Sequence, residues 1–288
     1  MKRLIVNADG FGFTFGINKG IFESVTDGIV TSTSCVVNFP AIEDVGKLAR
    51  EFKPLSIGIH FNLSVGSPVC KPKEIPSLVD ETGEFHGARF SSLLMKGKIV
   101  EEEMVKELRA QARILKSNGV EISHWDGHQN KHLYPPFFRS GMSVAKEFGI
   151  KAIRTHRRYL FSSESNNRTR VLVKYYISHP KQIATHIYAR RNTRMAERNG
   201  FKAADRLITP AYLDRSKKSN LETWISIMKR LPEGTNEIYC HPGYPDDTLR
   251  KYAVYVDERL EEVAIMKSAE VKEAARENGV TLISFWEL

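Results

Sequence analysis

The sequence of 288 residues has no long apolar run and only three cysteines. No stretch of about 18 consecutive apolar residues occurs, which excludes an ordinary membrane-spanning helix. The apolar run that follows Arg3 ends at Asp9 and is too short for a secretory signal. The cysteines are odd in number and lack metal-ligand spacing, which argues against a disulfide framework. We therefore expect a cytoplasmic protein without an integral membrane segment.

The sequence also lacks the glycine patterns that cradle phosphate groups. Neither GxGxxG nor GxxxxGK[ST] occurs, which disfavours an open nucleotide-binding sheet. Internal repeats and low-complexity tracts are absent as well. An apolar content of 41% and a charged content of 27% are those of an ordinary globular protein. A chain of this length can bury one large core.

The net charge of +9 is concentrated in one segment. From Lys151 to Arg206 there are 14 basic and 3 acidic residues, so the rest of the chain is close to neutral. Such a segment can attract phosphate, nucleic acid or a membrane surface, although a solvated insertion is the commoner explanation. No recognised nucleic-acid-binding module accompanies it, so we expect no nucleic-acid partner. We predict a single domain over residues 1–288 with a basic helical insertion at 156–206.

Short apolar runs alternate with amphipathic stretches along the chain. Strands are predicted at residues 3–8, 29–38, 55–61, 151–155, 237–241 and 281–285, with one more leading into residues 124–132. Helices are predicted at residues 17–28, 41–52, 100–119, 221–231 and 257–279, the last as one long helix. This alternation implies a parallel β/α architecture, either a closed barrel or an open doubly wound sheet.

Polar side chains follow several of the predicted strands at their carboxyl ends. Asp9, His60 and His241 each end an apolar run, and the segment HWDGHQNKH (residues 124–132) is the densest group of this kind. In a β/α barrel these strand ends form one face, where catalytic groups gather, so a barrel is favoured over an open sheet. The structural alternatives are that Asp9 caps a turn, His60 is a core histidine and His241 supports a tight turn.

Five segments carry a family resemblance. In order they are NADGFG (7–12), GIVTSTS (28–34), GIHFNLS (58–64), HWDGHQNKH (124–132) and EIYCHPGY (237–244), and they resemble the motifs of the YdjC/ChbG carbohydrate deacetylases. The resemblance implies an α/β fold, a distorted TIM-like β/α barrel of the polysaccharide-deacetylase type. It also implies a hydrolase that uses a divalent metal, Zn or Mg, to remove an N-acetyl group from an amino sugar or short oligosaccharide.

The resemblance also assigns roles to individual residues. It implies that Asp9 is the general base and that His241 is the general acid or a substrate-side histidine. It implies that His60 and His128 bind the metal. The predicted partner is an N-acetylated sugar or oligosaccharide, with a phosphate group on the sugar and a homodimer left as open options. Apart from the resemblance, Asn62, Tyr134 and Trp125 are candidates for substrate binding, and the alternative for the aromatic side chains is a place in the core.

The site departs from the family motif at two positions. Gly10 stands where the family has a second aspartate, the carboxylate ligand of the metal, and Asn130 replaces a histidine. The missing ligand could be supplied by Asp9, by Asp126 or by His132, and Asp126 could instead orient a ligand histidine through its ring N–H. The alternative function is an impaired family member that binds a sugar or sugar-nucleotide without turning it over.

Overall fold

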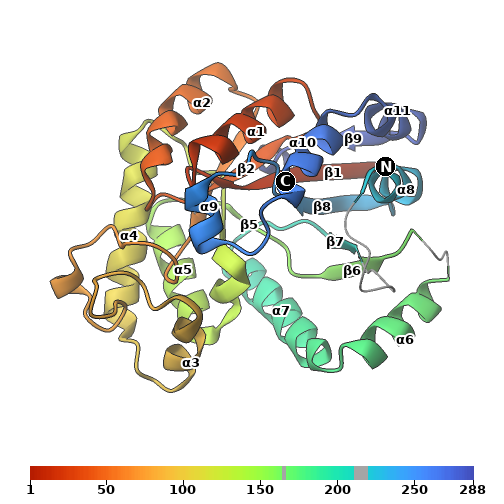
Figure 1. The fold of residues 1–288 in the computed structure, drawn as a ribbon. Coiled ribbons are helices and arrows are strands. Elements are labelled where there is room, and N and C mark those ends of the chain that lie inside the picture. The colour runs from red at the N-terminus through yellow and green to blue at the C-terminus, as the bar shows by residue number, and fades with distance from the viewer. Residues whose placement is uncertain (164–166, 211–219) are drawn as a thin grey trace.

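The computed structural model describes residues 1–163, 167–210 and 220–288. Its centre is a curled sheet of parallel strands in the order β5-β4-β3-β2-β1-β8-β7-β6, with β9 paired to the start of β1 (Figure 1). The strands are β1 (Lys2–Phe11), β2 (Ser32–Cys35), β3 (Ser56–Phe61), β4 (His124–Gly127), β5 (Ala152–Ile153), β6 (Arg158–Phe161), β7 (Arg206–Pro210), β8 (Gly234–Cys240) and β9 (Val280–Leu282). The sheet forms a half-barrel, a distorted version of the TIM-like fold, as predicted.

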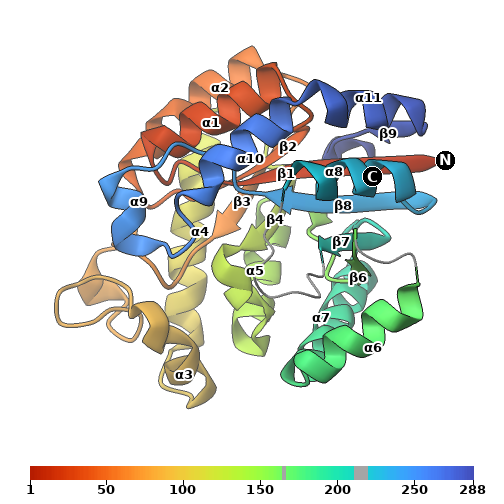
Figure 2. The same ribbon diagram turned by 45° about the vertical axis from the view of Figure 1, so that its right-hand side comes forward.

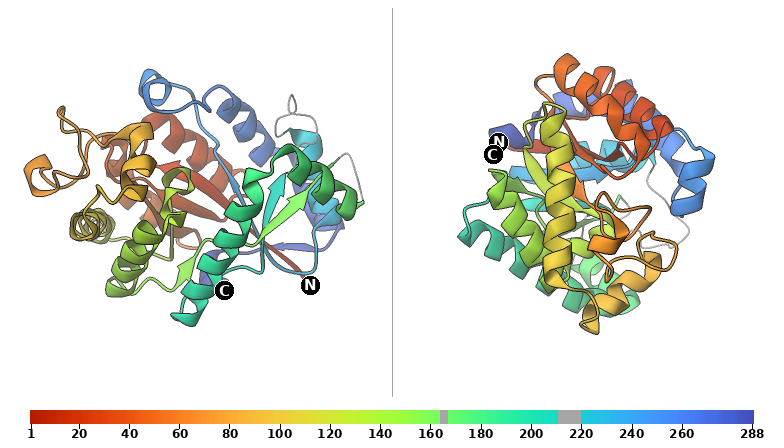
Figure 3. Two further views of the ribbon diagram at one scale, coloured as in Figure 1. Left: turned by 90° about the horizontal axis from the view of Figure 1, so that it is seen from below. Right: turned by 90° about the vertical axis from the view of Figure 1, so that its left-hand side faces the viewer.

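Helices cover the outer side of the curled sheet (Figure 3). The α-helices are α1 (Phe15–Thr26), α2 (Val45–Glu51), α3 (Phe90–Met95), α4 (Glu101–Ser117), α5 (Pro135–Glu147), α6 (Arg168–Ser178), α7 (Lys181–Arg198), α8 (Leu221–Arg230), α9 (Asp247–Tyr252), α10 (Glu258–Lys267) and α11 (Ala269–Glu277). Short 3-10 turns, including η4 (His128–Leu133), join several of them. No helix of the described residues is long and apolar enough to cross a membrane.

The local sequence explains how β1 leads into α1. Residues Leu4, Ile5, Val6 and Ala8 of β1 are fully buried, which is typical of a parallel strand covered on both faces. Thr14 ends the connection by accepting the backbone N–H of Ile17, an N-cap that starts α1 directly after the strand. Asp9 and Gly10 therefore lie in the last residues of β1, at the rim of the sheet.

Three predictions of secondary structure were wrong. The expected long helix at 257–279 is two helices, α10 and α11, because the side chain of Ser268 accepts the backbone N–H of Val271 and starts a new helix. The strand predicted at 29–38 is shorter, covering only β2. The basic segment 156–206 is not helical throughout, since it also supplies β6, which pairs with β7 in the sheet.

Gly58 of β3 has no room for a side chain, because the imidazole of His124 lies against it. A Cβ at Gly58 would lie 2.4 to 2.6 Å from the ring atoms of His124 on the neighbouring strand. The imidazole of His124 is stacked on Phe285, with ring centroids 3.7 Å apart, so it has little room to move. Overpacking of a fixed ring forces backbone shifts, which destabilise a protein.

Gly58→Ala is therefore expected to lower the free energy of unfolding by about 1–3 kcal/mol. Chemical denaturation of the variant and the wild type measures this difference. Gly46→Ala is the matched control, because its new methyl group would lie 3.3 Å from the flexible end of Arg50 and 3.4 Å from the carbonyl oxygen of Asn118, both much looser contacts than those at Gly58. Equal stability of the two variants would contradict the steric argument.

Candidate active site

The buried guanidinium of Arg154, just after β5, lies at the centre of the polar cluster. It donates to both carboxylate oxygens of Asp9, at 2.8 and 2.5 Å, and lies 2.7 Å from Oδ2 of Asp126. Its Nε donates to Glu237 at 3.0 Å. One cation thus faces three buried carboxyl groups, which come from β1, β4 and β8. Buried charges of this kind are stable only when they are paired and hydrogen-bonded.

Burial and Arg154 act on these carboxyl groups in opposite directions. Burial alone would raise the pKa of Asp9 and of Asp126, but the Arg154 cation outweighs it, and both pKa values lie below the usual range. For Glu237 burial is the larger effect and raises the pKa to about 7. Asp9 and Asp126 are therefore ionised at neutral pH.

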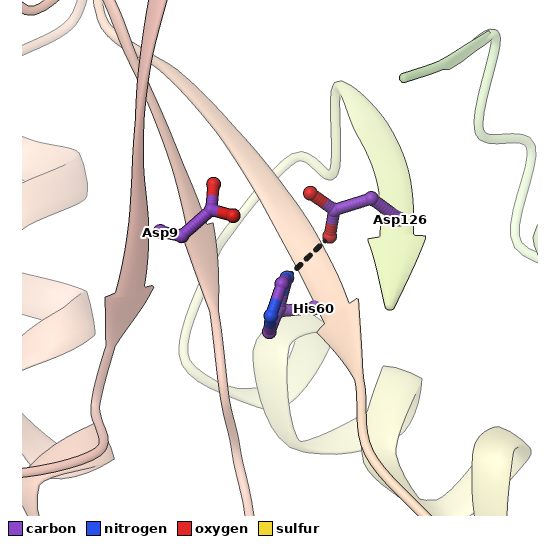
Figure 4. A group of neighbouring side chains, drawn as sticks. All are labelled: Asp9, His60 and Asp126. Carbon is purple, nitrogen blue, oxygen red and sulfur yellow. Dashed lines mark hydrogen bonds and ion pairs between the residues drawn. The ribbon is translucent and has the colours of Figure 1, made fainter. Parts of the chain in front are cut away.

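Asp126 also holds the imidazole of His60 in place. Nδ1 of His60 lies 2.6 Å from Oδ1 of Asp126, and the two residues are paired across β3 and β4 (Figure 4). Because an ionised carboxylate can only accept, Nδ1 of His60 carries the hydrogen. Burial alone would lower the pKa of His60, but Asp126 and then Asp9 outweigh it and raise that pKa above its ordinary value. In its neutral form His60 presents the lone pair of Nε2 to a ligand, the arrangement that is typical of metal-binding histidines.

His128 contributes a second imidazole, at the start of η4. Its ring centroid lies 5.5 Å from that of His60, and its Nε2 is buried without a hydrogen-bond partner among the described residues. Burial, and then the neighbouring His60, lower the pKa of His128 well below its ordinary value. The ring is therefore neutral, the form in which histidine binds a metal.

Asp9, His60 and Asp126 form a buried group that can hold a metal ion, because their ligand atoms all lie within 4.8 Å of one another (Figure 4). However, the same two carboxylates are already bonded to Arg154. A metal at this group would have to share the carboxylate oxygens with the guanidinium, or lie on the side of His60 that faces away from it.

His241 follows β8 and faces Asp9 across the site. Its Nε2 lies 4.0 Å from Oδ2 of Asp9. Its backbone N–H donates to Glu262, and its ring packs edge-on against Tyr255. Burial, and then the Arg259 cation, lower the pKa of His241 to about 3. His241 is therefore a neutral imidazole near neutral pH.

These groups line one cavity of about 220 Å³ at the carboxyl ends of the strands. The sequence-predicted residues that meet there are Asp9, His60, His128 and His241. Asp126 lies directly behind His60. The wall is completed by Gly10 and Tyr239 and by residues that the sequence analysis did not select: Arg154, Tyr252, Tyr255 and Arg259. For Arg154 a signal existed, because it ends the apolar run KAIR just as Asp9 ends LIVNA.

Four other predicted site residues lie elsewhere. His132 is fully buried and its Nε2 lies 2.8 Å from Nε2 of His156, outside the lining of the cavity. Trp125 is buried in the core. Asn62 is also buried, where its side chain bonds the backbone of the loop that follows β3. Tyr134 is half-buried and lines a second, neighbouring cavity.

The fold and the site together define a class of protein. It is a parallel β/α half-barrel with a buried histidine–carboxylate group, able to hold a metal, at the carboxyl ends of its strands. The family model for "YdjC-like protein" matches residues 3–277. The chain therefore belongs to the YdjC-like family, as its motifs predicted.

Named relatives span the whole chain. A carbohydrate deacetylase of Geobacillus stearothermophilus is 30% identical over 289 residues, covering 99% of this chain and 98% of its own. A chitooligosaccharide deacetylase of Escherichia fergusonii is 30% identical and covers 100% of this chain and 99% of its own. A crystal structure from Enterococcus faecalis V583, provisionally described as a cellobiose-phosphate cleavage protein, has a TM-score of 0.77 and 27% identity, covering 99% of this chain and 98% of that one.

Replacement of the central cation should be costly. Arg154→Met would leave three buried carboxyl groups without their partner, and we expect the free energy of unfolding to fall by about 3–5 kcal/mol. Arg109→Met is the matched control, because Arg109 bonds Glu147 with both side chains at least 35% exposed, and should cost less than about 1 kcal/mol. Denaturant titrations measure both. A stability loss for Arg154→Met no larger than the control's would refute the central role of this cation.

Proposed function

We propose that the protein is a metal-dependent carbohydrate N-deacetylase, which hydrolyses the N-acetyl group of an amino sugar or short oligosaccharide. One observation carries this proposal: an ionised carboxylate, Asp9, faces a neutral imidazole, His241, beside two further imidazoles in one cavity. The names of the full-length relatives support the same reaction class. The sugar would enter from the side of Tyr252 and Tyr255, which line the cavity wall.

The donor groups fit a divalent metal. Nε2 of His60 and Nε2 of His128 would hold it, since the first is freed by Asp126 and the second is a buried nitrogen without a partner among the described residues. Two imidazoles suit zinc better than magnesium, which prefers carboxylate oxygens. When bound, the metal would polarise the amide carbonyl and make water more acidic.

The chain's own residues would handle the protons. Amide hydrolysis needs a base for the attacking water and a proton for the departing nitrogen. Arg154 keeps Asp9 ionised and fixes its orientation, so Asp9 would accept the water's proton. His241 is neutral in the resting protein, so it must gain a proton before it can donate one. Its Nε2 lies 4.0 Å from Asp9, which would let the proton taken from water reach the leaving nitrogen through His241.

The second candidate function is a sugar-binding protein without catalysis, and Gly10 is the observation that favours it. The family's carboxylate ligand is missing there, and both oxygens of the neighbouring Asp9 are bonded to Arg154. A site with only two imidazoles would bind metal weakly. Acetate release from a panel of N-acetylated sugars, abolished by a chelator and restored by zinc, separates the two functions.

His241→Ala should separate proton transfer from metal binding. We expect kcat to fall by about 10²–10⁴ while the bound metal, measured by elemental analysis, stays at the wild-type level. His128→Ala is the comparison variant, which should lose metal and activity together. Loss of metal in His241→Ala would make His241 a ligand and contradict its assignment to proton transfer.

Gly10→Asp should tighten divalent-metal binding. The backbone at Gly10 has φ +104°, so a side chain costs about 1–2 kcal/mol of strain, but its Cβ would meet no heavy atom closer than 4.0 Å. Gly10→Asn is the matched control, with the same strain and no charge. We expect calorimetry to show at least about tenfold tighter Mg²⁺ binding by the aspartate variant than by the asparagine variant. Equal affinities would mean that another carboxylate already serves the metal.

A further inference from the structure

The helices α6 and α7 form a hairpin, here called the basic hairpin (Arg168–Arg198), at the β6 end of the sheet. The turn between the two helices points away from the sheet (Figures 1 and 2). The hydroxyl of Tyr176 and Nδ1 of His186 lie 2.9 Å apart, which joins the two helices. The ring of Tyr175 stacks on His179 beside the turn. The hairpin is thus a built element with its own internal contacts.

Large apolar side chains are exposed on this hairpin. Of the twelve exposed large hydrophobic side chains in the described part of the chain, five lie between residues 173 and 188. The exposed fractions are 53% for Val173, 75% for Ile177, 45% for Ile183 and 66% for Ile187, and Tyr188 is also exposed. Four of these five lie within the 12 residues that include the turn, with Ile177 on α6 and the other three on α7. A concentration of exposed apolar groups marks a surface that is covered by something else.

The same hairpin is strongly basic. It contains eight arginine and lysine residues and one glutamate. Val173 and Ile177 share the exposed face of α6 with Arg170 and Lys174, at positions three and four residues apart. On α7 the exposed isoleucines are followed by exposed Arg190, Arg191 and Arg194. Isoleucines at the tip and arginines behind them are thus arranged along one projecting element.

We propose that the basic hairpin docks on a bilayer surface that contains anionic lipid. Exposed apolar side chains insert at the boundary between headgroups and acyl chains, while basic side chains beside them bind the anionic headgroups. A nucleic acid would use the arginines but would leave the isoleucines exposed to water. A second copy of the chain would bring two strongly positive hairpins together, which would repel each other.

Docking in this way would bring the membrane close to the substrate cavity. The N-terminal half of α7, through Gln182, Thr185 and Tyr188, lines a second cavity of about 640 Å³. Gln129 and Asn130 line both this cavity and the active-site cavity, so the two adjoin. This second step rests on the proposed deacetylase function: the substrate class is then an amino sugar carried on a membrane-anchored molecule.

Vesicle flotation of the full chain tests the docking. Wild type should float with vesicles of phosphatidylcholine containing 30% phosphatidylglycerol, and should not float with phosphatidylcholine alone. The triple variant Ile177→Ser, Ile183→Ser, Ile187→Ser should weaken binding by at least about tenfold, and Arg190→Gln with Arg191→Gln by about ten- to thirtyfold. The matched controls make comparable changes at exposed sites elsewhere: two aliphatic side chains become serine in Val100→Ser with Leu260→Ser, and two cations are removed in Lys53→Gln with Lys98→Gln.

Four results would overturn the docking proposal. They are no flotation of the wild type, flotation that the isoleucine variant leaves unchanged, tight oligonucleotide binding without vesicle binding, and a dimer in sedimentation that the isoleucine variant abolishes. Flotation needs no catalysis, so its failure leaves the deacetylase proposal standing.

The substrate class has its own test. N-acetylglucosamine on a diacylglycerol anchor, carried in the same anionic vesicles, should release acetate at least about tenfold more slowly with the isoleucine variant than with wild type. The two proteins should act equally on soluble N-acetylated sugars. Turnover of soluble sugar with none of the anchored sugar would overturn the substrate class alone. Absence of turnover on both, with flotation intact, would overturn the deacetylase function alone.

Discussion

The site depends on the charge balance around Arg154. Its guanidinium bonds carboxyl groups that come from three separate strands, and its own backbone N–H donates to the carbonyl of Trp125, which extends the pairing of β4 with β5. The same residue therefore closes part of the sheet, keeps Asp9 ionised and fixes Asp126, which in turn orients His60. Both the ionisation of the site and the packing at this end of the half-barrel therefore depend on the one buried cation of Arg154.

Near this cation, β2 and β3 carry small residues where β4 carries large polar side chains. Ser34 donates to Asp126 and lies 3.1 Å from Nε2 of His124, while Gly58 leaves room for that imidazole. Small residues on β2 and β3 thus allow large polar residues on β4 to point inward. These polar groups bond one another across several strands of the sheet, whereas Nε2 of His128 is buried without a hydrogen-bond partner among the described residues.

The position of Gly10 separates this chain from the motif that its family resemblance implies. A positive φ at this residue suits glycine, and the space beside it is open. Without a carboxylate at this position, the groups that remain to bind a metal are the imidazoles of His60 and His128 and the carboxylates of Asp9 and Asp126, which Arg154 already neutralises. Asn130 also has a positive φ, of 56°, and lines both cavities. The departure at Gly10 thus removes a carboxylate from the site, whereas the departure at Asn130 affects the wall that the two cavities share.

The sequence alone determined the alternation of strands and helices, the preference for a β/α barrel over an open sheet and the residues at the strand ends, because these follow from local periodicity and from the shared direction of parallel strands. The distorted form of the barrel was implied by the family resemblance, and its opening into a half-barrel is seen in the structure. The sequence analysis missed β6 and β7, whose apolar runs are short and lie within or beside the basic segment, and it did not show that Ser268 starts a new helix. Only the tertiary structure decided which polar groups meet. Residues such as His132 and Trp125 belong to the same motif as His128, yet their side chains turn into the core, where His156 and the aromatic rings of other segments contact them. Such contacts join residues far apart in the chain, and no local pattern specifies them.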